Sequence, residues 1–450
     1  MFRVGRFIIG FLVITLCVGG VYFVWQLRQH GIQGLQALTK FLPVSQEKKS
    51  LLDTLFSLGD YTLASDNKER AFLVLFQNNW ELRPGGGFIG SFGIVKVKNG
   101  QLTSLQVHDT GNFDGRIPST VVPPYPLAQT LRIDSWKLRD SNFSPDFAEN
   151  AKQAEYFYHL GQGQEQFDGV IGVTANVLTS LLDITGPVML EGYPGTYAKE
   201  DGIYTLEYQV EVGYKEQGIA KGERKSVMQA LANAIAQKLQ PLDTFKKIQV
   251  AQVVLRNLET KDIQLYFKDP SLQLLVKDQN WSGNVDTAWS KDYLLMVDSN
   301  LGAYKSDYFI RRWAHYTVDL STDVPTATLA ITYRHTAPKR DWLTTHYHTY
   351  LRIYAPKDSW LESSQNLAKP TFGSEFNKTS FGFLIDVPIT QEKTVSLTYT
   401  LPKSIKDTYD LKLQKQAGVS DEPVNVTIID AQGNKTEHAV TLHGDVVLSS

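Results

Sequence analysis

Hydrophobic and polar positions along the chain change their pattern three times, which predicts four regions. The first contains a stretch from position 7 to 25 with no charged residue, in which nearly every side chain is apolar. A short region of helical or irregular character follows, and then short apolar runs alternate with longer runs of helical spacing. The last region consists of alternating runs separated by turn residues. We therefore expect an N-terminal anchor (1–26), a helical stalk or linker (27–66), an α/β domain (67–270) and a β-sandwich-like domain (271–450).

The apolar stretch is long enough to cross a bilayer, because about 19 helical residues at 1.5 Å each span roughly 28 Å. Arg3 and Arg6 precede it, so the positive-inside rule places the N-terminus in the cytoplasm and the bulk of the chain outside. A cleaved signal peptide is one alternative, but no A-x-A-like site follows. A lipoprotein at Cys17 is another, but Leu16 fills a position that should be small. The pattern favours a single-pass protein of the cell membrane, with the lipid bilayer as a partner.

The α/β region mixes strand and helix signals. The Asn-Gly of KNGQ joins the runs FGIVKV and LTSLQV, which is the strongest short signal for a hairpin. One helix is expected to begin at Ser144, with Pro145 at its first helical position, and to end at Gly161. A second is expected to be capped by Thr174 and to end at Gly186, and GERKSVMQALANAIAQKLQ predicts a third. This order predicts a mixed sheet with helices packed on its faces.

From about Asp292 onward, strand signals recur at regular spacing. Turn residues separate runs such as YLLMVDS, TATLAITYRH, YHTYLRIYAP, SFGFLIDVPI and VNVTIID. This arrangement is typical of an antiparallel sandwich. The expected fold class is therefore α/β, with a mixed sheet and helices on its faces, followed by an antiparallel β-sandwich.

Composition narrows the possible functions. The 450 residues carry a formal net charge of −2, which excludes a general electrostatic affinity for nucleic acid. The single cysteine, Cys17, falls inside the apolar stretch. The rest of the chain can therefore form neither a disulfide nor a thiolate metal site.

Several long motifs in a fixed order resemble one bacterial family. They are NNWELRPGGGFIGSFG, LRDSNFSPDFAENAKQAEYFY, FDGVIGVTANVLTSLLDITGPV, DYLLMVDSNLGAYKSDYFIRR and YLRIYAP. In this order they look like the family catalogued as domain of unknown function 4012. The likeness covers most of the chain after the predicted linker, including the β-rich end. The family is named for its unknown function, so the resemblance identifies the family but implies no activity.

A more distant likeness concerns the LytR-CpsA-Psr glycopolymer transferases. FDGVIGVTANVLTSLLDITGPV is similar to a strand and helix of those enzymes, and GERKSVMQALANAIAQKL is similar to their Arg-rich helix start. They are single-pass membrane proteins that move polymers from a polyprenyl pyrophosphate carrier onto the cell wall. Their Pro-Arg-Asp segment has its nearest counterpart in VHDTGNFDGRIP, which is not a clean match. The resemblance implies an extracytoplasmic cell-envelope protein, with a polyprenyl-linked glycan or peptidoglycan as partner.

The stretch ELRPGGGFIGSFG places charges and three consecutive glycines between two predicted strands. A phosphate loop of the Walker type is excluded, because a strand and not a helix follows the glycines. One interpretation is an anion-binding nest made by the N–H groups of Gly85, Gly86 and Gly87, with Arg83 pairing with a phosphate. The other is that Glu81 and Arg83 pair with internal partners while the glycines allow close backbone packing.

Arg139 and Asp140 stand just before the helix expected at Ser144. Asp140 can cap that helix, which requires no ligand. In the functional interpretation, Arg139 contacts an anion and Asp140 serves as a metal ligand or an acid–base group.

The run HDTGNFDGR gathers His108, Asp109, Asp114 and Arg116. Aspartates in loops can hold Mg²⁺ or Ca²⁺ through their oxygens, although the spacing does not match an EF-hand. The alternative is ordinary turn chemistry.

Arg224 and Lys225 stand at the start of a predicted long helix, where cations oppose the helix dipole. An anionic neighbour is therefore expected. It is either a protein carboxylate such as Glu211 or the phosphate of a ligand.

Two functional hypotheses follow. In the first, the protein handles or transfers polyprenyl-pyrophosphate-linked glycopolymers as a phosphotransferase, and Arg83, Arg139 and Arg224 neutralise the pyrophosphate. Asp140 or Asp109 is then catalytic and supports Mg²⁺. In the second, the chain is a non-catalytic binding or scaffolding module of the cell surface with the same fold. Arginines and an acid lining one concave pocket would favour the enzyme, whereas arginines that pair internally would favour the module.

Overall fold

The computed structural model describes residues 46–239, 242, 244–406 and 408–449. The predicted membrane segment (7–25) and the first part of the predicted linker lie outside these residues. Among the helices that are described, none combines the length and the apolar character needed to cross a membrane.

The chain forms two compact units, which we call the α/β unit and the sandwich unit. Each unit is built from three stretches of the chain. The α/β unit comprises the described residues within Met1–Gln77, Ile89–Pro118 and Phe147–Gly283, and the sandwich unit comprises those within Asn78–Phe88, Ser119–Asp146 and Asn284–Ser450.

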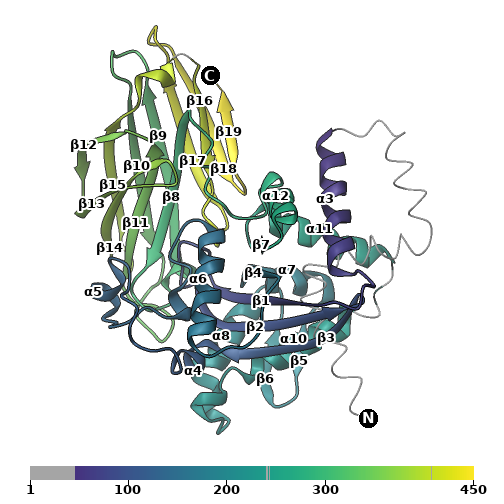
Figure 1. The fold of residues 1–450 in the computed structure, drawn as a ribbon. Helices are drawn as coiled ribbons and strands as arrows, with labels where there is room; N and C mark the ends of the chain where they lie inside the picture. Colours follow the sequence, from purple (N-terminus) through teal and green to yellow (C-terminus); the bar gives the residue numbers. More distant parts are fainter. Residues whose placement is uncertain (1–45, 240–241, 243, 407, 450) are drawn as a thin grey trace. The chain divides into compact units, whose positions relative to one another are not determined.

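A five-stranded mixed sheet forms the centre of the α/β unit (Figure 1). The strand order is β3-β2-β1-β4-β7, with β1 and β4 parallel and the β2–β3 and β4–β7 pairs antiparallel. Asn99 and Gly100 have φ values of 51° and 70°, so the predicted Asn-Gly hairpin between β2 and β3 is confirmed. The strands are β1 (Glu69–Asn78), β2 (Phe88–Lys98), β3 (Gln101–Asp109), β4 (Gly169–Thr174) and β7 (Ile263–Phe267), and a separate hairpin is made by β5 (Val188–Leu190) and β6 (Tyr193–Tyr197).

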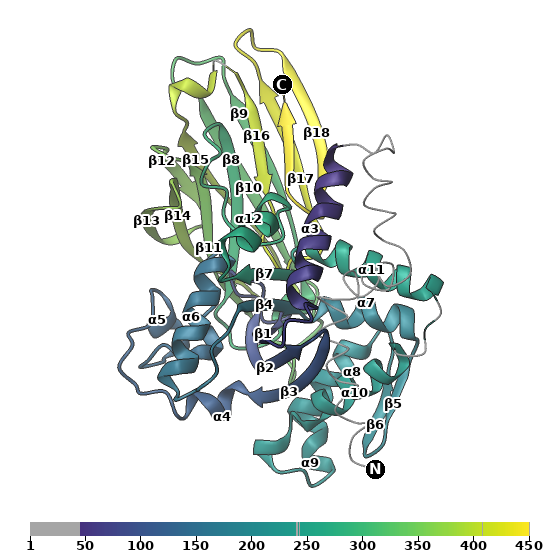
Figure 2. The same ribbon diagram turned by 45° about the vertical axis from the view of Figure 1, so that its right-hand side comes forward.

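Helices cover both faces of this sheet (Figure 2). Successive side chains of β4 point to opposite faces of the sheet. Ile171 and Val173 pack on one face, in the main core, with side chains of α7, α10 and α11. Gly172 faces the other way, where an added Cβ would lie 2.7 Å from the ring of Phe147 in α6. The predicted mixed sheet with helices on its faces is therefore confirmed. The helices are α3 (Gln46–Thr62), α4 (Thr110–Asp114), α6 (Phe147–Leu160), α7 (Asn176–Thr185), α8 (Gly202–Tyr208), α9 (Tyr214–Glu216), α10 (Ser226–Leu239), α11 (Thr244–Glu259) and α12 (Pro270–Asp278).

Two helix starts differ from the prediction for a physical reason. The helix expected at Ser144 begins at Phe147, because the carboxylate of Asp146 accepts hydrogen bonds from Asn284 and from the N–H of Val285 instead of capping. Helix α7 has no side-chain cap, because the hydroxyl of Thr174 donates to Asp262 at 2.6 Å. The predicted stop of α7 at Gly186, with φ 71°, is confirmed.

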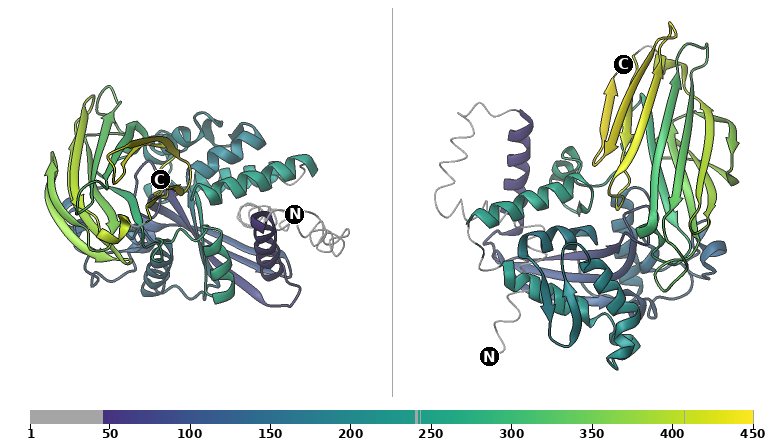
Figure 3. Two further views of the ribbon diagram at one scale, coloured as in Figure 1. Left: turned by 90° about the horizontal axis from the view of Figure 1, so that it is seen from above. Right: turned by 180° about the vertical axis from the view of Figure 1, so that it is seen from behind.

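Two six-stranded sheets form the sandwich unit, and Figure 3 shows them as two layers. Their orders are β12-β15-β10-β9-β17-β18 and β13-β14-β11-β8-β16-β19. The strands are β8 (Asp292–Asn300), β9 (Ile310–Asp319), β10 (Thr326–His335), β11 (Tyr347–Pro356), β12 (Trp360–Gln365), β13 (Ala368–Glu375), β14 (Lys378–Val387), β15 (Glu392–Thr400), β16 (Asp410–Gln414), β17 (Glu422–Ile429), β18 (Lys435–Leu442) and β19 (Val446–Ser449).

The sandwich is not wholly antiparallel as predicted. Strand β16 runs parallel to β8, and β17 runs parallel to β9, so each sheet contains one parallel pair. Strands β12 and β13 were not predicted, because they lie at sheet edges and are exposed on nearly every residue, which leaves no alternation to detect. The sandwich unit also contains α5 (Leu127–Leu131).

Candidate functional site

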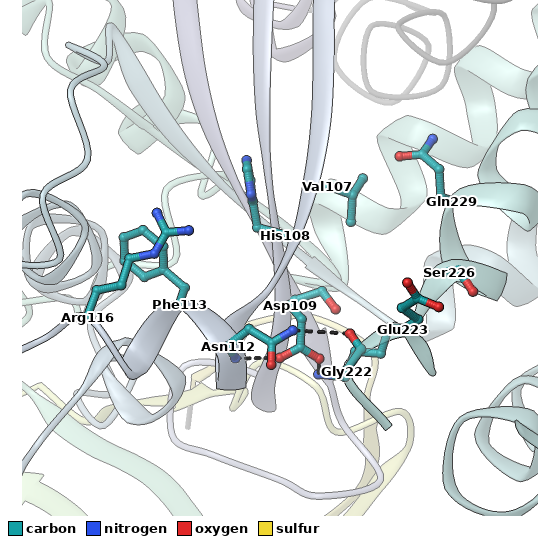
Figure 4. A pocket seen from close by; sticks show the side chains of 12 residues that line it. Val107, His108, Asp109, Asn112, Phe113, Arg116, Gly222, Glu223, Ser226 and Gln229 are labelled. Atoms are coloured by element: carbon teal, nitrogen blue, oxygen red, sulfur yellow. Dashed lines mark hydrogen bonds and ion pairs between the residues drawn. The ribbon is translucent and has the colours of Figure 1, made fainter. Parts of the chain in front are cut away.

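A cavity of about 520 Å³ lies in the α/β unit, where β3 ends and α10 begins (Figure 4). Strand β3 and α4 supply one part of its wall, and the segment from 222 to 229 supplies the part that faces Arg116 in Figure 4. Its volume falls in the range of small-molecule sites. The lining residues are Ser91, Val107, His108, Asp109, Asn112, Phe113, Arg116, Gly222, Glu223, Lys225, Ser226 and Gln229.

Asp109 connects the two parts of the wall. One carboxylate oxygen accepts a hydrogen bond from the N–H of Asn112 at 2.8 Å and caps α4. The other lies 2.9 Å from the ammonium of Lys225, which also donates to the carbonyl of Gly90. The Asn112 side chain in turn donates to the carbonyl of Gly222 at 3.1 Å. Asp109 therefore performs the turn chemistry that we predicted as an alternative, and it does so at the edge of a cavity.

Burial and the mutual attraction of Asp109 and Lys225 both shift the pKa values of these two residues. Burial lowers the pKa of Lys225, and the attraction of Asp109 only partly offsets it. For Asp109, burial alone would raise the pKa, but Lys225 and the hydrogen bond from Asn112 lower it below its ordinary value. Asp109 is therefore ionised at neutral pH.

Two exposed charges at the cavity are not neutralised in this way. Arg116 holds its guanidinium 5.5 Å from the centre of the Phe113 ring, and within the described part of the chain it forms no ion pair. Glu223 also forms no ion pair with a described residue. Figure 4 shows these two side chains on opposite sides of the cavity. A cation and an anion are thus both available to a ligand.

His108 lines the cavity with a neutral, partly buried ring. Its ring stacks on Phe92 with the ring centres 4.9 Å apart. Burial lowers the pKa of His108, and the charge of Arg116 adds to the effect, so the ring is neutral at neutral pH. Its Nε2 is buried and has no hydrogen-bond partner among the described residues. A ligand cannot reach this nitrogen without displacing its neighbours.

Arg224 pairs with the protein rather than the cavity. Its guanidinium lies 2.7 Å from the carboxylate of Glu211, and it is not among the lining residues. Of the two anions expected beside the start of this helix, the structure shows the protein carboxylate. Lys225, by contrast, lines the cavity.

Arg83 belongs to the sandwich unit, where it is 1% exposed. Its Nε lies 3.1 Å from the carboxylate of Asp140, and one terminal nitrogen lies 3.3 Å from that of Glu81. The other terminal nitrogen donates to the carbonyl of Asn300 at 2.7 Å. The structure therefore shows the internal pairing of Glu81 and Arg83 that we considered as one interpretation.

The three glycines of the same stretch are used for close packing. The N–H of Gly85 donates to the carbonyl of Asn142, and that of Gly86 donates to the carbonyl of Arg83. A Cβ at Gly87 would lie 2.4 Å from the carbonyl of Asn78, so only glycine fits there. With two of the three N–H groups already bonded to the protein, this turn is not built as an anion nest.

Arg139 and Asp140 lie in a short turn of the sandwich unit, and Asp140 is 3% exposed. The carboxylate of Asp140 faces Arg83 and so does not cap α6. Arg139 is half-buried and has interaction partners within the protein. The predicted anion site thus falls on two sets of residues, Arg83, Gly85, Gly86, Gly87, Arg139 and Asp140 in the sandwich unit and Asp109, Arg224 and Lys225 in the α/β unit.

The predicted Mg²⁺ has no ready ligand set. Asp140 faces a guanidinium and Asp109 faces an ammonium, each where a metal cation would bind. The described residues contain no group of three or more His, Cys, Asp or Glu side chains arranged to hold a metal. A role for Mg²⁺ stays a prediction.

The sequence singled out His108, Asp109, Arg116 and Lys225 of the cavity lining, but not Glu223, Ser226 or Gln229. His108, Asp109 and Arg116 stand in one short polar run, which can be seen in the sequence. The facing residues, which include Glu223, Ser226 and Gln229, lie at the start of GERKSVMQALANAIAQKL, a run that predicted a helix and carried the resemblance to an Arg-rich helix start. Within this run the sequence singled out Arg224 and Lys225, of which Lys225 lines the cavity.

Comparisons with known proteins agree with the motifs. The family described as "Protein of unknown function (DUF4012)" matches residues 67–210. No curated protein matches the chain in sequence. Solved structures that resemble it include the Lin1025 protein from Listeria innocua, with 13% identity and a TM-score of 0.28 over 51% of this chain and 86% of that chain. Another is B. subtilis TagV, with 12% identity and a TM-score of 0.27 over 48% of this chain and 81% of that chain.

At these TM-scores neither likeness identifies an activity. The sequence resemblance that the motifs predicted is confirmed, and residues 67–210 match the family of unknown function catalogued as DUF4012.

Proposed function

We propose that this chain is a membrane-anchored, extracytoplasmic protein of the bacterial cell envelope that binds an anionic glycopolymer presented on a polyprenyl pyrophosphate carrier. In this proposal the cavity of the α/β unit receives the anionic end of the ligand. The envelope location rests on the apolar N-terminal stretch and on the family resemblance of the sequence. The observation that carries the binding site is the guanidinium of Arg116, which forms no ion pair with any described residue and lies at the edge of a cavity of about 520 Å³.

Binding without transfer is the version that the geometry supports best. Arg83 is buried against Asp140 and Glu81, and Arg224 is paired with Glu211. These cations are therefore not free to neutralise a leaving pyrophosphate. Asp109, the candidate acid–base group at the cavity, is paired with Lys225. Transfer would require this pair to open.

The test measures binding of a polyprenyl-pyrophosphate-linked glycan to the purified full-length chain in lipid nanodiscs. Arg116→Gln should weaken binding by about tenfold or more, because a hydrogen bond between charged groups contributes about 1.5–3 kcal/mol. Lys199→Gln is the matched control, since Lys199 pairs with Asp183 at an exposed site of the same unit. It should leave binding unchanged.

Two results would change the proposal. Equal affinity of the Arg116→Gln variant and the unaltered chain would remove the cavity from it. Release of the polyprenyl carrier, with the glycan transferred to an acceptor by the purified chain alone, would replace binding by catalysis.

A further inference from the structure

The charges around the cavity are balanced, and this limits what it can bind. Arg116 and Lys225 are the cations in the lining, and Asp109 and Glu223 are the anions. Because Asp109 lies 2.9 Å from Lys225, the charge of that lysine is already matched. By the same pairing Asp109 adds little net charge, so a compact ligand with several negative charges would meet the carboxylate of Glu223 with only Arg116 to offset its own charge. The lining therefore suits a ligand with one negative charge.

The remaining polar groups suit hydroxyls. Glu223 is a carboxylate, and so it can only accept hydrogen bonds. Asn112, Ser226 and Gln229 carry groups that both donate and accept, and each keeps further hydrogen-bonding capacity beside the one partner that it has within the protein. Arg116 lies across the cavity from Glu223 (Figure 4), and the Phe113 ring beneath it restricts its orientation. A ligand that reaches both sides needs an anion at one end and hydroxyl donors at the other.

We infer that the cavity recognises a sugar unit that carries a single anionic group, either a uronate or a phosphodiester-linked sugar, with Arg116 on the anion and Glu223 on the hydroxyls. This inference rests on the proposed function and names the part of the glycopolymer that enters the site. It assigns the pyrophosphate of the carrier no place in the cavity.

The experiment is calorimetric titration of the full-length chain in nanodiscs with four probes. They are glucuronate, the methyl phosphodiester of glucose 1-phosphate, neutral glucose and inorganic pyrophosphate. We expect one or both singly charged sugars to bind at least tenfold more tightly than glucose and than pyrophosphate. The better of the two identifies the source of the anion.

Variants assign the two ends of the ligand. Arg116→Gln should abolish the preference for the charged sugars over glucose. Glu223→Gln should weaken the binding of the sugars severalfold and strengthen that of pyrophosphate, because it removes one of the two carboxylates. Glu200→Gln, an exposed change of the same kind outside the cavity, should do neither.

Failure of this inference can be told apart from failure of the proposed function. Pyrophosphate binding more tightly than both charged sugars would overturn the inference while the proposed function stands. The same holds if no probe binds but the lipid-linked glycan does. If the lipid-linked glycan fails to bind as well, the proposed function falls too.

Discussion

Arg83 illustrates at the residue scale why a cation in a suggestive motif need not bind a ligand. It stands beside three glycines, and yet it is 1% exposed and faces Asp140 and Glu81. Burial by itself would lower the pKa of Arg83, but these two carboxylates more than offset the burial, so the pKa is raised. A buried cation so placed holds segments together that are far apart in sequence. Arg116 is the opposite case, because it is exposed and has no ion pair with a described residue.

Arg83→Gln should therefore destabilise the sandwich unit. It leaves the buried carboxylates of Asp140 and Glu81 without their cation, which typically costs about 3–5 kcal/mol. Chemical denaturation followed by tryptophan fluorescence measures the change. Arg334→Gln removes an arginine from an exposed pair with Glu392 in the same unit and should cost no more than about 1 kcal/mol. Equal costs for the two variants would show that the buried pairs contribute little.

At the scale of elements, the turn between β1 and β2 is held by close backbone packing. Gly87 approaches the carbonyl of Asn78, and a Cβ at Gly418 would lie 1.9 Å from the carbonyl oxygen of Gly86. The side chain of Asn79 donates to the carbonyl of Gly418 at 3.1 Å. All these residues belong to the sandwich unit. The glycines thus allow two backbone segments to touch where any side chain would separate them.

Gly87→Ala should disrupt this packing, because its Cβ would lie 2.4 Å from backbone atoms, which cannot move as a flexible side chain can. Overpacking of this kind costs about 1–3 kcal/mol. Gly302→Ala is the matched control in the same unit, since the nearest atom to its Cβ, 3.3 Å away, belongs to the Asn300 side chain. The midpoint of thermal unfolding should fall clearly for Gly87→Ala and little for Gly302→Ala. Similar midpoints would contradict the close-packing role.

Elements whose signals are local could be predicted from the sequence. The Asn99–Gly100 turn and the stop at Gly186 need only their own φ values. Features decided by distant partners could not be predicted. Thr174 gives its hydroxyl to Asp262, 88 residues away, so it does not cap α7 as a local pattern suggests. The cavity could be predicted only in part for the same reason, because Glu223 and Arg116 come to line one cavity only through the fold.

At the scale of the whole molecule, the sequence pattern predicted two consecutive domains, whereas each unit of the structure takes three separate stretches of the chain. The segments Asn78–Phe88 and Ser119–Asp146 belong to the sandwich unit, although they are flanked on both sides by elements of the α/β unit. The chain therefore passes from one unit to the other five times. The pattern of apolar positions does not predict these crossings. The contacts that hold the two segments in the sandwich unit, such as the hydrogen bond from Arg83 to the carbonyl of Asn300, join residues more than 200 positions apart.

The burial of Asp292 leads to a prediction of how the stability of the sandwich unit depends on pH. It is fully buried, and it accepts hydrogen bonds from Tyr409 at 2.7 Å and from Tyr316 at 3.0 and 3.1 Å. Burial raises the pKa of Asp292 from 3.8 to about 6, although these hydrogen bonds act in the opposite direction. The folded state thus binds the proton more tightly than the unfolded state. The stability that this proton contributes is present below pH 3.8 and is lost as the pH rises through about 6.

The expected loss is roughly 2 kcal/mol between pH 4 and pH 7, because one pKa unit corresponds to about 1.4 kcal/mol and part of the effect is already lost at pH 4. Denaturation of the Asp292→Asn variant should lack this part of the pH dependence. Tyr409→Phe removes a donor to the ionised carboxylate and should shift the loss to higher pH, since the charged form is then less favoured. A purely structural role would lower stability equally at every pH. If both variants run parallel to the unaltered protein across this range, the proton on Asp292 does not contribute to its stability.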